Sequence, residues 1–104
     1  MKAAIIYNPN ATGMNEDVLK SMNMTLSKQG IMVNEFESRY PGHTVELVRK
    51  VNDDSDLIVT MGGDGTLGEA FRGLGDIDQK SLLSHISTGT ANDTPIFDSC
   101  KKIY

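Results

Sequence analysis

Three glycines and one acid stand together in the middle of this chain, in the run Gly62-Gly63-Asp64-Gly65-Thr66. Glycine lets the backbone approach a ligand closely and adopt positive φ angles where a turn needs them. The run follows an apolar stretch that favours a strand and precedes a pattern that favours a helix. Backbone N–H groups at the start of a helix can bind a phosphate, and an acid beside them suits metal or polar contacts. The run therefore predicts a nucleotide site.

The same glycines fit other interpretations, which the residues downstream of the run distinguish. The spacing Gly63-x-Gly65-x-x-Gly68 matches the dinucleotide-binding fingerprint, which expects an acid about 20 residues later at the end of the next strand. The next predicted strand ends Ile86-Ser87-Thr88 without an acid, and the glycine turn is the third along the chain instead of the first. A Walker-type loop is excluded because the run lacks a Gly-Lys-Ser or Gly-Lys-Thr at the required spacing. A tight turn without a ligand needs only two glycines, so the third favours a phosphate loop.

Two further polar turns come after predicted strands. One runs from Asn8-Pro9 to Gly13, where the Asn8 amide offers a nucleotide both a donor and an acceptor. The other is Thr88-Gly89-Thr90-Ala91-Asn92-Asp93, whose polar side chains are also suited to cap the next helix. Glu69 is expected in the first turn of the helix after the glycines. There it either complements the helix dipole or faces the nucleotide or its magnesium.

Apolar runs alternate with helical patterns along the chain, as in an α/β layered fold. Strands are predicted over 3–7, 31–36, 56–61 and 82–87, and helices over 15–29, 43–52, 67–74 and 94–103. Consecutive aliphatic residues at 57–59 indicate a strand buried on both faces, in the centre of a parallel sheet. Such sheets bind ligands beyond the carboxyl ends of their strands. The three polar turns are therefore expected to gather on one rim.

Composition sets the limits of the function. The 104 residues suffice for one domain, and the net charge of −4 argues against a nucleic-acid partner held by bulk electrostatics. No stretch approaches the roughly 18 apolar residues of a membrane span, and the N-terminal apolar run is too short for a signal peptide. Cys100 is the lone cysteine, and no Cys/His set has zinc spacing. We therefore expect a cytoplasmic protein, in which His43 and His85 are structural or solvent-facing.

Four segments together resemble the diacylglycerol kinase catalytic domain family, which includes bacterial lipid kinases and sphingosine kinases and is related to NAD kinases. The run from Gly62 to Glu69, followed by Gly73-Leu74, is similar to its glycine-rich signature. Residues 8–13 resemble its Asn-Pro-x-Ser-Gly loop, and residues 38–43 its Thr-x-x-Pro-Gly-His segment. Residues 89–93 resemble its Gly-Thr-x-Asn-Asp turn. Order and spacing agree over nearly the whole chain.

The resemblance implies a three-layer αβα sandwich with a mainly parallel, Rossmann-like sheet, and an ATP-dependent kinase that phosphorylates a lipid hydroxyl with Mg²⁺. Asp64 is then expected to be catalytic and to hold the metal, directly or through water. Phosphoryl transfer needs mostly positioning and charge neutralisation, which such groups supply. The residues that the resemblance places at the nucleotide or its metal network are Asn8, Pro9, Gly13, Ser38, Gly62, Gly63, Asp64, Gly65, Thr66, Glu69, Gly89, Thr90, Asn92 and Asp93.

The chain also departs from the family. Gly68, Ser87 and Thr94 stand where its members usually have Asn, Pro and Phe, and the members carry a further β-rich, C-terminal domain with the general base and much of the lipid site. Residues 1–104 are therefore expected to be the nucleotide-binding domain alone, inactive on lipid by itself. The alternatives are a non-catalytic nucleotide-binding or regulatory remnant and an NAD kinase relative. Expected partners are a nucleotide, a lipid substrate in the parent, a transient membrane surface at most and a second copy of the chain.

Overall fold

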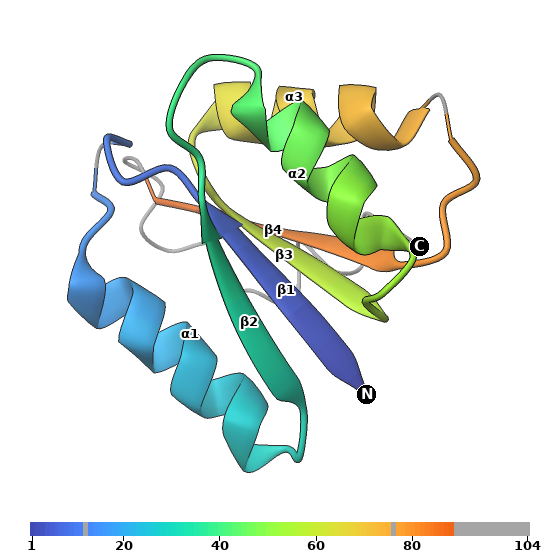
Figure 1. Cartoon of the computed structure of the whole chain (residues 1–104). Coiled ribbons are helices and arrows are strands. Elements are labelled where there is room, and N and C mark those ends of the chain that lie inside the picture. The colour runs from blue at the N-terminus through green and yellow to red at the C-terminus, as the bar shows by residue number, and fades with distance from the viewer. Residues whose placement is uncertain (12, 76, 89–104) are drawn as a thin grey trace.

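Four parallel strands and three helices alternate along the chain in the computed structural model, which describes residues 1–11, 13–75 and 77–88 (Figure 1). The elements are β1 (Lys2–Tyr7), α1 (Glu16–Lys28), β2 (Met32–Glu37), α2 (His43–Asn52), β3 (Leu57–Gly62), α3 (Asp64–Gly75) and β4 (Leu82–Ser87). The strand order is β2-β1-β3-β4, and every pairing is parallel. Helix α1 lies on one side of the sheet, whereas α2 and α3 lie together on the other. The predicted three-layer α/β fold is confirmed.

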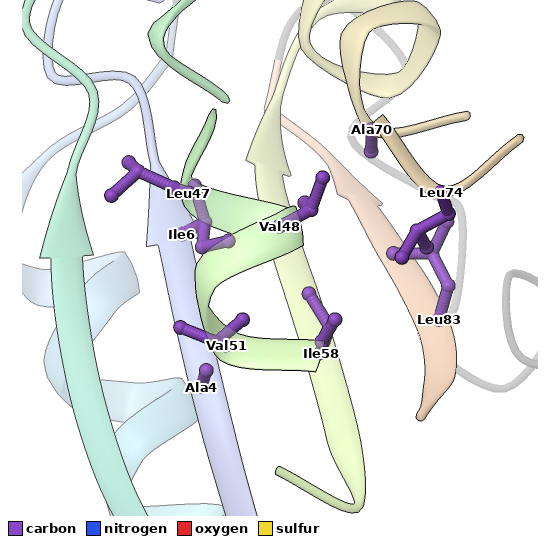
Figure 2. Close-up of a cluster of buried hydrophobic side chains, with 9 residues drawn as sticks. All are labelled: Ala4, Ile6, Leu47, Val48, Val51, Ile58, Ala70, Leu74 and Leu83. Atoms are coloured by element: carbon purple, nitrogen blue, oxygen red, sulfur yellow. The ribbon is translucent and has the colours of Figure 1, made fainter. Parts of the chain in front are cut away.

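The layer between the sheet and helices α2 and α3 has more buried residues than the other apolar core (Figure 2). Ile6 on β1, Ile58 on β3 and Leu83 on β4 point from the sheet toward the helices, where Val48 of α2 is also fully buried. Helix α3 comes very close to α2 at Gly73, where a Cβ would lie 2.8 Å from the Val45 backbone oxygen. Gly73 is therefore required by close packing of two helices and does not mark a helix end.

The opposite layer packs α1 on alternate residues of the same strands. Met22 and Leu26 of α1 are buried against Ile5 of β1 and Val59 of β3. Because Val59 faces α1 while its neighbours face α2 and α3, β3 is covered on both faces, as its consecutive aliphatic residues predict. The start of the helix is capped by Asn15, whose side chain accepts a hydrogen bond from the Val18 N–H at 3.0 Å.

Most element boundaries agree with the sequence prediction, and one differs in a way that matters for function. Those of α2 and β4 are identical to the prediction, and the other strands and α1 differ by one or two residues. Helix α3 begins at Asp64 and not at Leu67, so Gly62 ends β3 and Asp64, Gly65 and Thr66 belong to the first turn of the helix. The predicted helix over 94–103 lies outside the described residues. No helix in the described part of the chain is long and apolar enough to cross a membrane.

Candidate functional site

A groove of about 320 Å³ opens at the edge of the sheet where the strands end. Its walls come from three segments that are distant in sequence. They are the end of β1, the loop between β2 and α2 together with the start of α2, and the first two turns of α3. The lining residues are Asn8, Asn10, Ser38, Arg39, Tyr40, Pro41, Thr44, Gly65, Thr66 and Glu69. Both helices direct their N-termini to this edge, because each follows the carboxyl end of a parallel strand. Two helix N-termini at one groove favour an anionic ligand.

Asn8 fixes the first wall. Its backbone N–H donates to the Met61 carbonyl at 3.1 Å, which ties the end of β1 to the end of β3. Its side-chain Oδ1 accepts from the Asn10 N–H at 2.9 Å, so the chain turns immediately after the strand. Pro9 faces a different pocket, on the α1 side of the sheet, and Gly13 has a positive φ of 81°. The structure thus brings Asn8 to the groove and directs Pro9 away from it.

The loop before α2 forms the second wall and is held in place by several contacts. The Ser38 N–H donates to the Tyr7 carbonyl at 2.8 Å, and Ser38 is buried. Gly42 has a φ of 88°, a left-handed conformation that favours glycine, and its N–H donates to Glu69 Oε2 at 3.2 Å. The Arg39 N–H donates to His43 Nδ1 at 2.9 Å. The loop is therefore fastened to β1, to α3 and to itself.

The glycine run supplies the third wall. The Gly63 carbonyl accepts the first helical hydrogen bonds, from the N–H groups of Thr66 at 3.1 Å and Leu67 at 3.3 Å. A Cβ at Gly62 would overlap the Thr66 side chain, so glycine is needed where the strand passes under the helix. Gly65 and Thr66 line the groove, whereas Asp64 is exposed at its margin. The first N–H groups of a helix have no partner within it and remain available to a ligand.

The geometry divides the predicted site residues into four groups. The groove gathers Asn8, Ser38, Gly65, Thr66 and Glu69, while Gly62, Gly63 and Asp64 adjoin it. Pro9 and Gly13 do not line it, and Gly89, Thr90, Asn92 and Asp93 lie outside the described residues. Glu69 belongs to the second turn of α3 and not to the first, because the helix begins earlier than predicted. Its contact with Gly42 is a structural role that the sequence pattern does not indicate.

Five groove residues are absent from the set predicted from sequence: Asn10, Arg39, Tyr40, Pro41 and Thr44. Arg39 lines the groove, and its Nε lies 3.6 Å from Glu37, a residue of the pocket on the α1 side, in an exposed ion pair. Arg39, Tyr40 and Pro41 lie within residues 38–43, the segment that carries part of the family resemblance, and Thr44 follows it directly. The sequence pattern therefore identifies the segment but not which of its residues line the groove, and the prediction includes only Ser38.

His85 is buried on β4, on the side of the sheet that faces α2 and α3. Its Nδ1 lies 2.8 Å from the Thr60 hydroxyl, and Nε2 has no hydrogen-bond partner among the described residues. Burial lowers the pKa of His85, although the negative charge of Asp64 and the Gly62 backbone carbonyl oppose this shift. The environment is that of a neutral, structural histidine, in agreement with the sequence prediction.

Comparison with known proteins agrees with this architecture. Residues 2–97 match the diacylglycerol kinase catalytic domain family, to which the chain belongs. A diacylglycerol kinase of Staphylococcus carnosus is 29% identical over 94 residues, which are 88% of this chain and 31% of that protein. One of Staphylococcus epidermidis is 33% identical over 94 residues, 88% of this chain and 30% of that protein.

A solved structure extends the likeness to three dimensions. The crystal structure of a diacylglycerol kinase from Bacillus anthracis superposes with a TM-score of 0.74 at 25% identity, over 88% of this chain and 34% of that one. The chain thus spans about a third of the length of the relatives that it matches. The family resemblance and the fold expected from sequence are both confirmed.

Proposed function

We propose that this chain is the nucleotide-binding domain of an ATP-dependent lipid kinase, which transfers the γ-phosphoryl group of ATP to diacylglycerol or a similar lipid hydroxyl. The observation that carries the proposal is the meeting of two helix N-termini at one groove, with Thr44 of α2 and Gly65 and Thr66 of α3 in its wall. Helix N-termini stabilise phosphate through free N–H groups and the helix dipole. Membership of the family supports ATP as the phosphate source.

The charged groups of the groove have separate tasks in this proposal. Arg39 lies in the groove wall and neutralises phosphate charge. Asp64 is exposed at the first position of α3, beside the N-terminus on which the phosphates rest. Mg²⁺ is usually bound through one or two carboxylates together with phosphate oxygens and water, so Asp64 fits a metal that arrives with the nucleotide. The described residues contain no group of three or more His, Cys, Asp or Glu that could hold a metal by themselves.

Two sets of residues bind the nucleotide for phosphoryl transfer. Asn8, Ser38, Thr66 and Glu69 orient the nucleotide, and the family resemblance assigns the same task to Gly89, Thr90, Asn92 and Asp93, which lie outside the described residues. Mg²⁺ supplies charge stabilisation as the γ-phosphoryl group leaves. The general base and most of the lipid site belong to the part of the relatives that this chain does not match. The 104 residues alone are expected to bind the nucleotide without phosphorylating lipid.

Calorimetric titration of the 104-residue chain with Mg-ATP tests the proposal. Wild type should bind, and Asp64→Ala should bind more weakly in Mg²⁺ but nearly equally to wild type in EDTA, because the lost carboxylate acts through the metal. Asp54→Ala is the matched control, since Asp54 is exposed and precedes β3 at the opposite edge of the sheet. Absence of binding by wild type would refute the nucleotide site. Robust diacylglycerol phosphorylation by this chain would refute its expected inactivity.

A further inference from the structure

We propose that Tyr40 is a stacking platform for the nucleobase, so that the groove binds a whole nucleotide and not its phosphates alone. This inference rests on the proposed nucleotide site and adds a contact for the base to the contacts for the phosphates. Tyr40 lines the groove while its side chain remains 51% exposed. It occupies one of the two positions that the Thr-x-x-Pro-Gly-His resemblance leaves open, so this residue is a feature of the present chain.

Among the described residues, the ring of Tyr40 has one stacking partner. His43, the first residue of α2, stacks on the Tyr40 ring with ring centroids 4.3 Å apart and an interplanar angle of 13°. A flat ring has two faces, and the stack with His43 covers one of them. The large exposure of Tyr40 therefore belongs mostly to the second face and the ring edge, which are open to a planar ligand.

Contacts around the stack fix its orientation before any ligand arrives. The Tyr40 hydroxyl donates to Glu46 Oε2 at 2.9 Å, and His43 Nδ1 accepts from the Arg39 N–H at 2.9 Å. The next turn of the loop is fastened by the Gly42 N–H bond to Glu69. A side chain that is already ordered loses little conformational entropy on binding, which favours affinity.

The chemistry of the two ends of the groove matches the two ends of a nucleotide. The N-termini of α2 and α3 and the Arg39 charge suit phosphate, whereas an open aromatic face suits a purine or pyrimidine ring. Stacking recognises the π-face that every base shares, so Tyr40 increases affinity for nucleotides in general and does not select adenine. Inorganic triphosphate offers the same phosphate oxygens without a base and is therefore the discriminating ligand.

The experiment compares Mg-ATP and Mg-triphosphate binding to the 104-residue chain and three variants. Tyr40→Ala should bind ATP about 5- to 100-fold more weakly, as expected for loss of one base–aromatic stack. Its affinity for triphosphate should equal that of wild type, which also shows that the phosphate end is still folded. Tyr40→Phe keeps the ring but loses the hydroxyl bond to Glu46, so it should bind ATP less tightly than wild type and more tightly than Tyr40→Ala. Phe71→Ala is the control, because Phe71 is 52% exposed on α3 and does not line the groove.

A second measurement uses wild type alone and is therefore independent of any disturbance of the loop by mutation. In NMR spectra, ATP should shift the ring proton signals of Tyr40 and His43, and triphosphate should leave the Tyr40 ring signals nearly unchanged. The inference alone is overturned if ATP binds without moving the Tyr40 ring signals, or if Tyr40→Ala loses no ATP affinity. If wild type binds neither ligand, the proposed nucleotide site fails and this inference falls with it.

Discussion

Glu69 Oε2 accepts a hydrogen bond from the Gly42 backbone N–H at 3.2 Å and so joins two segments that lie 27 residues apart. Glu69 projects from the second turn of α3, and Gly42 is the left-handed residue immediately before α2. One carboxylate thereby fastens the loop of residues 38–43 to the helix that carries the glycine run. This contact fixes the relative position of two groove walls together with the close packing of α2 on α3 at Gly73.

Removal of this carboxylate should loosen the loop without unfolding the domain. In Glu69→Ala the amide exchange of Gly42 should accelerate about 10- to 150-fold, since a hydrogen bond to a charged group contributes about 1.5–3 kcal/mol. Glu69→Gln keeps a side-chain acceptor and should stay near wild type. Hydrogen exchange followed by NMR without ligand makes the measurement. Equal exchange rates of Gly42 in wild type and Glu69→Ala would contradict this role.

Two glycines of α3 should respond oppositely to the same change. Gly73→Ala should lower the free energy of unfolding by about 1–3 kcal/mol, because the new Cβ would overlap Val48 and the Val45 backbone. In Gly68→Ala the new Cβ has no atom within 4 Å, and the higher helix propensity of alanine should raise the free energy of unfolding by up to about 1 kcal/mol. Urea denaturation of the two variants gives both values. A neutral Gly73→Ala would show that α2 and α3 are not packed so closely.

Asn52 holds the chain that leads from α3 into β4 and should be sensitive to truncation. Its Nδ2 donates to the Asp78 carbonyl at 2.8 Å, and its Oδ1 accepts from the N–H groups of Lys80 at 2.9 Å and Ser81 at 3.2 Å. Asn52→Ala leaves these groups without their partner and should cost about 1–3 kcal/mol of unfolding free energy. Asn34→Ala, at an exposed position of β2, is the control and should change it little. Comparable stability of the two variants would show that water replaces the Asn52 contacts.

Stability should fall in mild acid because of His85. Burial lowers the pKa of His85 in the folded chain, so the unfolded chain binds the proton more readily. The stabilisation is complete above the ordinary value of about 6.5 and is lost as the pH falls below it, toward the folded pKa. One such group changes the free energy of unfolding by at most about 1.4 kcal/mol per pH unit.

His85→Gln removes this titration and keeps a polar side chain next to Thr60. Wild type should therefore lose more stability than His85→Gln when urea denaturation is repeated at about pH 7.5 and about pH 5, on either side of the ordinary histidine pKa. The remaining ionisable side chains are present in both proteins, so their contributions largely cancel in the comparison. Parallel stability profiles of the two proteins would mean that His85 has the same pKa in the folded and unfolded chain.

The fold was predictable because apolar pattern and turn residues agreed along the chain. Consecutive aliphatics identified β3, and the helix predicted over 15–29 agrees with α1, which Asn15 caps and which ends just before Gly30 with its φ of 81°. The predicted start of α3 was wrong because glycine has low helix propensity, so the helix was expected to begin only after the glycines. In the fold, the Gly63 carbonyl accepts the first helical bonds and the helix packs on the sheet, which outweighs that propensity.

The site was predictable only in part, because sequence spacing identifies the turns but not the side chains that they present. Asn8, Ser38 and Thr66 were expected and lie in the groove. Arg39 and Tyr40 reach it through the left-handed turn at Gly42 and the bond to Glu69, a tertiary contact that leaves no local pattern. Titration with Mg-ATP tests the roles of Asp64 and Tyr40, and the roles of the other groove residues stay predictions.

The central position of β1 has a consequence for how the chain folds. β1 precedes the other strands in the chain, yet it lies inside the sheet and pairs with β2 on one side and β3 on the other. Its pairing with β3 brings Lys2 to Asp56, 54 residues away, where the Lys2 N–H donates to the carboxylate at 2.8 Å. Closing so long a loop costs chain entropy before the contacts form, which slows folding. The same closure brings Asn8 to Met61, so appearance of the groove and the slow step of folding should share one rate constant.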